Sequence, residues 1–270
     1  MKYILAILFI LINISFISDD EKHLDINSRD VYYTFLKSGE SSLTSIRFQG
    51  LEVNDYQNRF HFENDSFFYA ISLNKNLKKL DISGTDLREM PNEIFELKHL
   101  TNLNLSSNNL SKINTKISCL KKLKVLYLGY NQIQSMDPIL RNTNIWYLSI
   151  SNNQIKEIPK NIHKLYKLET LFLGYNKIKI IPLNLRHIKC LEDLHLSNNL
   201  IDSIPEFLSQ YNDFSLIIYK NKVKYIPRSF CKDFRSLYIH CDPTVKVPIC
   251  LKEKNEKEFS GIQIASSIYY

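Results

Sequence analysis

Apolar and polar positions along this chain repeat with a period of about 23 residues. The spacing L-x-x-L-x-L, or a close variant of it, begins at residues 77, 100, 123, 145, 168, 191, 213 and 234. Each L-x-L core alternates apolar and polar positions, which predicts a short strand with one buried face. In the second half of a unit, for example residues 155–165, apolar residues recur every three to four positions around a proline. That half predicts a short helical or 3-10 return, so every unit should contain one strand and one return segment.

An asparagine follows the strand segment in six of the units, at Asn108, Asn131, Asn153, Asn176, Asn199 and Asn221. A buried asparagine at such a bend can bond backbone groups of neighbouring units, and unpaired buried polar atoms cost free energy. We interpret these side chains as a structural ladder and not as a binding site. Thr85 and Asp242 take the same place in the outermost units, as expected of atypical terminal repeats.

The complete unit, L-x-x-L-x-L-x-x-N-x-L-x-x-I-P-x-x-I-x-x-L-x-x, resembles the typical leucine-rich repeat. It is similar to the repeats of intracellular Ras-scaffold proteins and of many secreted or surface repeat proteins. The resemblance implies an α/β fold: a leucine-rich repeat solenoid (horseshoe) with a parallel concave sheet and short helical or 3-10 convex segments. It implies no catalytic residue, because the shared positions are structural. The unit at residues 123–144 departs from the pattern, since Met136-Asp137-Pro138 shifts the proline by one position.

The pattern divides the chain into four segments. Residues 1–18 form an apolar N-terminal segment, and residues 28–76 are predicted to be an N-terminal cap with one degenerate repeat. The repeats, about eight units, occupy residues 77–250. Residues 251–270 begin with mixed charges and no apolar period, which predicts a solvated C-terminal tail.

The N-terminal segment has the layout of a secretory signal peptide: one lysine, then mostly apolar residues to Ile17, then acidic residues from Asp19. A membrane-spanning helix needs about 20 apolar residues, so the segment is short for an anchor. The cleavage site is poorly defined, because Asn13 and Phe16 are unfavourable two places before Ser15 and Ser18. A cleaved signal, an uncleaved anchor and an apolar strand of the cap remain as alternatives.

Cysteines and sequons bear on the cellular compartment. Three of the five cysteines, Cys231, Cys241 and Cys250, cluster near the last repeat. One disulfide among them, with Cys231–Cys250 preferred, fits an extracellular protein, and three buried thiols are the alternative. If the chain enters a secretory lumen, N-x-S sequons make glycan acceptors of Asn64, Asn104 and Asn109.

Aromatic residues gather at strand positions that should face away from the core in the middle repeats. The predicted partner-binding residues are Tyr127, Tyr130, Trp146, Tyr147, Phe172, Tyr175 and His195. Exposed aromatic clusters with a polar rim are typical of protein-binding hot spots, where truncating one anchor costs about 2 kcal/mol or more. The alternative is that the rings only pair across neighbouring strands, which is worth roughly 0.2–1 kcal/mol each.

Charge and motifs narrow the function further. The net charge is +7, yet the basic residues form no stripe along the predicted strand face, so we expect no nucleic-acid partner. The sequence contains no phosphate-cradling loop, no H-E-x-x-H and no G-x-S-x-G. We therefore predict a non-enzymatic scaffold that binds a protein partner without a cofactor, metal or small-molecule substrate. We expect it to be secreted or at the cell surface, with membrane contact only if the N-terminal segment stays uncleaved; the alternative is a cytoplasmic adaptor that docks on a GTPase or phosphatase.

Overall fold

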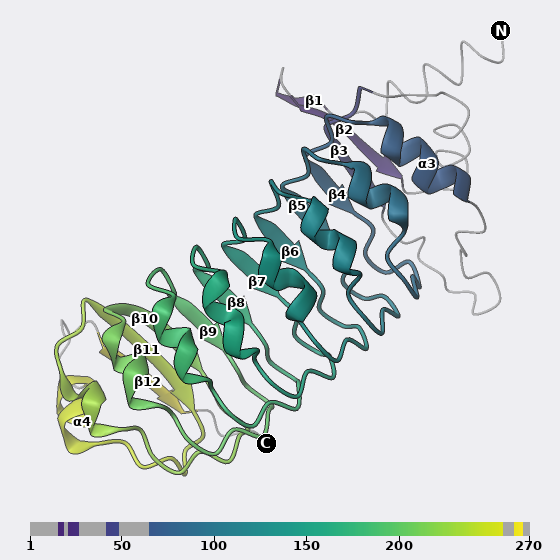
Figure 1. The fold of residues 1–270 in the computed structure, drawn as a ribbon. Helices are drawn as coiled ribbons and strands as arrows, with labels where there is room; N and C mark the ends of the chain where they lie inside the picture. Colours follow the sequence, from purple (N-terminus) through teal and green to yellow (C-terminus); the bar gives the residue numbers. More distant parts are fainter. Residues whose placement is uncertain (1–15, 19–20, 27–41, 49–64, 256–261, 267–270) are drawn as a thin grey trace, which may run out of the picture. The chain divides into compact units, whose positions relative to one another are not determined.

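The computed structural model of the chain describes residues 16–18, 21–26, 42–48, 65–255 and 262–266. The chain divides into two compact units, unit 1 (residues 1–131) and unit 2 (residues 132–270). In each unit, strands line one side of the stack and short helical segments cover the other (Figure 1). The parallel sheet and the 3-10 returns that the repeat predicts are confirmed in both units.

Unit 1 holds a sheet in the order β1-β2-β3-β4-β5-β6. β1 runs antiparallel to β2, and every later neighbouring pair is parallel. Its elements are β1 (Phe16–Ser18), β2 (Glu21–Ile26), β3 (Ser45–Phe48), α3 (Asp65–Leu73), β4 (Lys79–Asp81), η1 (Asn92–Glu96), β5 (Asn102–Asn104), η2 (Thr115–Cys119) and β6 (Val125–Tyr127).

Unit 2 holds a parallel sheet in the order β7-β8-β9-β10-β11-β12. Its elements are η3 (Asp137–Arg141), β7 (Tyr147–Ser149), η4 (Lys160–Lys164), β8 (Thr170–Phe172), η5 (Leu183–His187), β9 (Asp193–His195), η6 (Glu206–Gln210), β10 (Asp213–Ile217), η7 (Arg228–Cys231), β11 (Ser236–Cys241), α4 (Ile249–Asn255) and β12 (Ile262–Ser266).

Most of the 3-10 returns begin directly after a proline. The prolines Pro91, Pro159, Pro182, Pro205 and Pro227 have φ between −58° and −72°, the value to which the ring restricts them. In η3 the proline lies within the first turn, and Met136 takes the preceding position. The one-residue shift seen in the sequence is therefore accommodated at the start of a return segment.

The repeated asparagines join neighbouring repeats, as Asn176 illustrates, and all are buried except the half-buried Asn221. Its side-chain oxygen accepts from the Ile155 backbone N–H at 2.9 Å, and its amide donates to the carbonyl oxygens of Ile150 and Leu173 at 3.1 and 3.0 Å. Equivalent bonds are made by Asn108, Asn131, Asn199 and Asn221. Because one side chain satisfies backbone groups of two repeats, it fixes their spacing.

Both ends of the repeat array carry further elements. The predicted N-terminal cap, residues 28–76, contains β3 and α3, while residues 28–41 and 49–64 lie outside the described part. β1 falls within the predicted apolar segment 1–18, of which residues 1–15 are likewise outside it. Residues 251–270 contain the end of α4 and the strand β12, which pairs with β11. Among the described residues, no helix combines the length and the apolar character that crossing a bilayer requires.

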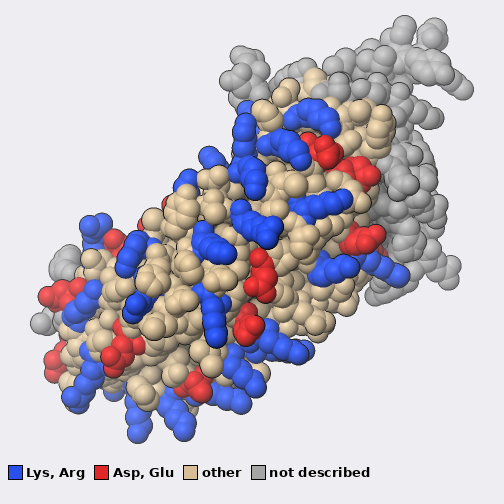
Figure 2. All heavy atoms as spheres, in the orientation of Figure 1, with Lys and Arg blue, Asp and Glu red and all other residues tan. Residues whose placement is uncertain are grey.

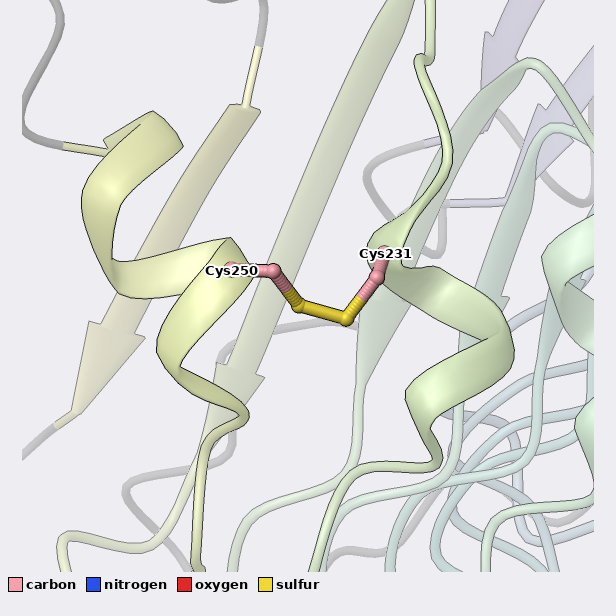
Figure 3. Close-up of a disulfide and its surroundings, with 2 residues drawn as sticks. All are labelled: Cys231 and Cys250. Atoms are coloured by element: carbon pink, nitrogen blue, oxygen red, sulfur yellow. A yellow bond between two sulfur atoms is a disulfide. The ribbon is translucent and has the colours of Figure 1, made fainter.

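A disulfide joins Cys231, at the end of η7, to Cys250 in α4 (Figure 3). The two Cα atoms lie 5.7 Å apart. Cys241 stays a buried thiol on β11, and burial raises its pKa to about 11, with a smaller contribution from the nearby Asp242 carboxylate. The bond thus ties the last 3-10 return of unit 2 to the helix that follows β11.

Candidate functional site

A continuous row of ring side chains crosses the face of the unit 2 sheet that points away from the buried core. We call it the aromatic track, and it consists of Trp146, Tyr147, Phe172, His195, Tyr219, Tyr238 and His240. Each ring has a neighbour in the row, with centroid separations from 4.7 Å for Tyr219–His240 to 6.5 Å for His195–Tyr219. All of these rings remain partly exposed, whereas the leucines that alternate with them on the strands are buried.

Parallel strand register brings the track together. Phe172 lies opposite His195 on the next strand, and Ile217 on β10 lies between His195 and His240. Tyr219 follows two residues after Ile217, and its ring contacts both histidines, at 6.5 and 4.7 Å. Since residues two apart share one face of a strand, the repeat period places ring after ring on the side that the core does not use.

His195 is a half-buried histidine of the track. Its Nε2 shares a hydrogen bond with Ser197 Oγ at 2.6 Å. Gly174 lies next to this pair, and a side chain at position 174 would crowd the hydroxyl and the carbonyl oxygen of Ser197. Burial lowers the pKa of His195, and the positive charge of a protonated His240 lowers it further. At neutral pH the imidazole is therefore uncharged, and this part of the track acts as an aromatic surface and not as a cation.

Tyr175 and Tyr130 lie at a bend where the backbone has a positive φ. In most repeats the residue before the ladder asparagine has φ near 55°, and two of these positions carry tyrosine. Tyr175 is 49% exposed and Tyr130 is 64% exposed. A large side chain in this conformation is uncommon and strained. Because exposure of this degree offers little packing energy in return, the two tyrosines are candidates for contact with a partner.

The structure separates the seven predicted contact residues into two groups. Trp146, Tyr147, Phe172 and His195 belong to the aromatic track, and Tyr175 lies in the same unit at the bend after β8. Tyr127 and Tyr130 belong to unit 1. There Tyr127 borders a polar hollow of about 200 Å³ in the sheet face, together with Lys79, Asp81, Asn102, Asn104 and residues of β2 and β3.

Three members of the track were not predicted from the sequence: Tyr219, Tyr238 and His240. Tyr238 and His240 stand at alternate positions of the last, degenerate repeat, and that alternation was the available signal. Tyr219 occupies the position that Gly174 and Ser197 hold in the preceding repeats. A search restricted to strand positions misses it, because its ring reaches the track from the bend that follows β10.

Polar residues of unit 1 also form bonds that the sequence did not predict. His23 Nδ1 shares a hydrogen bond with Ser45 Oγ at 2.8 Å, and its Nε2 lies 2.8 Å from an Asp25 carboxylate oxygen. The Asn104 amide donates to Asp81 at 3.0 Å. In the part of the chain that the structure covers, no group of three His, Cys, Asp or Glu side chains is arranged to hold a metal ion.

The predicted glycan acceptors differ in their surroundings. Asn104 is on β5, where its oxygen accepts from Ser106 and its amide donates to Asp81. Asn109 donates to Asp86 at 3.1 Å. Asn64 lies outside the described residues. Glycosylation of Asn104 stays a prediction. A glycan there would stand on the polar sheet face of unit 1 and would obstruct that part of the face.

Comparison with known proteins places the repeats among leucine-rich repeats. The family model described as "Leucine rich repeat" matches residues 75–138 and 143–201. No curated protein matches this sequence. Solved structures that resemble it in fold include the following three. The ectodomain of the Arabidopsis thaliana receptor kinase GASSHO1/SCHENGEN3 has 19% identity over 90% of this chain, with a TM-score of 0.67. The Listeria monocytogenes internalin InlF has 17% identity over 90% of this chain and 74% of its own, with a TM-score of 0.64.

The third is a plant peptide hormone receptor, RGFR1, with 25% identity over 74% of this chain and a TM-score of 0.55. The present chain spans 28% of the GASSHO1/SCHENGEN3 chain and 38% of the RGFR1 chain. These likenesses concern the fold, and they leave the ligand of this chain to be argued from its own surface.

Proposed function

We propose that this chain, which is a leucine-rich repeat protein, is a non-enzymatic scaffold that binds an extended segment of a protein partner across the aromatic track. The observation that carries the proposal is the unbroken row of seven partly exposed rings in unit 2. Partly exposed aromatic groups desolvate at low entropic cost when a partner covers them.

The spacing of the rings suits an extended peptide. Side chains on one face of an extended chain recur about every 6.6–6.8 Å. Neighbouring rings of the track have centroids 4.7–6.5 Å apart. Alternate residues of a bound segment can therefore lie over successive rings, while the residues between them point to solvent. Asp193, which lies beside Thr170 and Ser215 on the same face, supplies a polar border for orientation.

Two of the similar structures are complexes with a ligand. The GASSHO1/SCHENGEN3 ectodomain is in complex with CASPARIAN STRIP INTEGRITY FACTOR 2, and RGFR1 is in complex with RGF2. Those ligands belong to those proteins. They show that proteins with a similar fold bind ligands. The ligand chemistry that we propose for this chain, an extended segment with apolar and aromatic side chains, follows from the aromatic track.

We propose further that the chain works outside the cell or at its surface. The Cys231–Cys250 disulfide favours an oxidising compartment, and the layout of residues 1–18 favours secretion. The intact mass of the chain from its native cells tests this, measured before and after N-glycosidase and thiol alkylation. Loss of about eighteen N-terminal residues, with a glycan or a disulfide, supports secretion. A full-length chain with five free thiols and no glycan would favour the cytoplasmic adaptor.

The binding proposal is tested with a random-peptide display library on the full chain. We expect selected peptides to carry apolar or aromatic residues at alternate positions. The double variant F172A/Y219A should weaken binding of a selected peptide by on the order of 1,000-fold, because each of the two anchors contributes about 2 kcal/mol.

The matched control is Y166A/Y225A, which also removes two rings from unit 2. Tyr166 and Tyr225 are 52% and 58% exposed and are not part of the track. The control should bind as the wild type does. Equal loss in both double variants, or selected peptides whose binding ignores F172A/Y219A, would refute the aromatic track as the site. Circular dichroism of each variant separates loss of binding from loss of fold.

A further inference from the structure

Unit 1 has a row of lysines at the edge where its strands begin. The segments that lead into β4, β5 and β6 are residues 74–78, 97–101 and 120–124. They carry the lysines that we call the lysine edge: Lys75, Lys78, Lys98, Lys121, Lys122 and Lys124. All six are exposed, and these three segments contain no carboxylate. In Figure 2, Lys and Arg side chains crowd the area over β4 to β6 of Figure 1.

The repeat aligns these lysines. Lys75, Lys98 and Lys121 occupy the same position in three successive repeats. The backbone between them is in register, because the Thr101 N–H donates to the Lys78 carbonyl and the Lys124 N–H donates to the Thr101 carbonyl, each at 2.8 Å. Neighbouring strands lie about 4.8 Å apart, so the charges stand at one edge within roughly a Debye length of each other.

Such an arrangement does not serve the stability of the fold. Like charges on directly neighbouring strands repel one another. Among the acidic residues of unit 1, Asp86, Glu89 and Glu93 lie in the bend after β4 and in the return segment, and Glu96 ends η1 two residues before Lys98. The corresponding edge of unit 2 mixes signs within its leading segments: Arg235 pairs with Asp213 at 3.1 Å, and the segments that carry Lys167 and Lys189 end in Glu169 and Glu192. Within the described part of the chain, the three leading segments of unit 1 therefore differ in holding lysines with no carboxylate inside the segment.

We propose that the lysine edge of unit 1 binds an anionic lipid surface, which requires anionic lipid in the leaflet that faces the compartment of the chain. Exposed charges in a row along one edge can all face a flat membrane surface at the same time. Each lysine next to an anionic bilayer contributes about 1 kcal/mol of binding free energy. The choice of residue agrees with this partner. Arginine is preferred where single phosphates are bound in a bidentate manner, whereas lysine is a hydrated, flexible point charge.

The neighbours of the lysines distinguish this partner from a single-stranded nucleic acid. A nucleic-acid groove interleaves basic residues with aromatic rings on which bases stack. Residues 74–78, 97–101 and 120–124 contain no phenylalanine, tyrosine or tryptophan. The side chains between the lysines are instead those of Asn76, His99 and Thr101, together with buried leucines.

Vesicle co-sedimentation of the full chain tests the proposal. We expect the chain to partition onto phosphatidylcholine vesicles that contain phosphatidylserine, not onto pure phosphatidylcholine, and to be released by high salt. The variant K75A/K98A/K121A should lower the partition coefficient by on the order of 100-fold, since three lysines are removed from the surface. Exposed lysines tolerate alanine, and circular dichroism verifies the fold.

The control K156A/K160A/K164A removes three exposed lysines from unit 2 and changes the net charge equally. It should lower the partition coefficient by less than about fivefold. Three results would overturn the proposal: equal losses in the two triple variants, equal binding to both kinds of vesicle, or tighter binding to heparin or single-stranded RNA that depends on the same lysines. The last result would assign the edge to a soluble polyanion. None of these outcomes depends on the peptide site in unit 2.

Discussion

Tyr175 has a φ angle of 55°, and the equivalent residues of neighbouring repeats, Asn152 and Asn198, have 54°. Asparagine tolerates this left-handed region, whereas a large side chain there costs roughly 1–2 kcal/mol. We therefore expect Y175N to raise the free energy of unfolding by about 1 kcal/mol, measured by urea denaturation. The same substitution should weaken binding of a display-selected peptide if Tyr175 contacts it.

If Y175N is more stable than the wild type but binds the peptide more weakly, then Tyr175 serves binding at the expense of stability. Y166N is the control, because Tyr166 is similarly exposed and has no positive φ. A loss of stability in Y175N would mean that the ring packs against the protein and that the conformation is not strained.

His195 makes the stability of unit 2 depend on pH. Its pKa in the folded chain is below the usual 6.5 because of burial and the proximity of His240. Below pH 6.5 the unfolded chain therefore binds a proton more readily than the folded chain, and stability falls as the pH decreases through that value. In H195N we expect this part of the pH dependence to disappear. Urea unfolding between pH 5 and 8 measures it, and an unchanged slope would contradict the assignment.

At the scale of elements, the sequence predicted every strand from β4 to β11 because each has the L-x-L alternation and a fixed distance to the next. It also predicted the 3-10 returns, since prolines such as Pro159 and Pro182 fix the start of a turn. The asparagine ladder followed from chemistry, because a buried amide must find backbone partners. These features depend on spacing along the chain, and spacing is visible without a structure.

The site was less predictable, because it depends on how side chains reach across repeats. Tyr219 lies in a bend, and only the structure shows its ring between His195 and His240. Tyr127 satisfied the same strand criterion as Phe172, but it borders polar residues in unit 1. Aligning the repeats with one another gives the position of a residue within its repeat. Such an alignment does not give the rotamer, which decides whether neighbouring rings form one surface.

At the scale of the molecule, a repeat protein depends on what covers its outermost strands. Each internal repeat is stabilised by a neighbour on either side, whereas a terminal strand needs a cap. In unit 2, β12 covers β11 through five paired residues, from Leu237 with Ile262 to Cys241 with Ser266. The charged composition of residues 251–270 predicted a solvated tail, but the strand within that segment gives it the position of a cap.

Deleting residues 256–270 distinguishes a cap from a tail. Without β12, the backbone edge of β11 is exposed beside the buried side chains of Leu237 and Ile239, and an open strand edge promotes pairing between chains. We expect the truncated chain to self-associate in light scattering and to unfold at lower urea concentration, whereas a chain lacking only residues 267–270 should behave as the full chain does. If the longer truncation stays monomeric with unchanged unfolding, β12 contributes nothing to the stability of the array. The Cys231–Cys250 disulfide and α4 would then be sufficient to close its end.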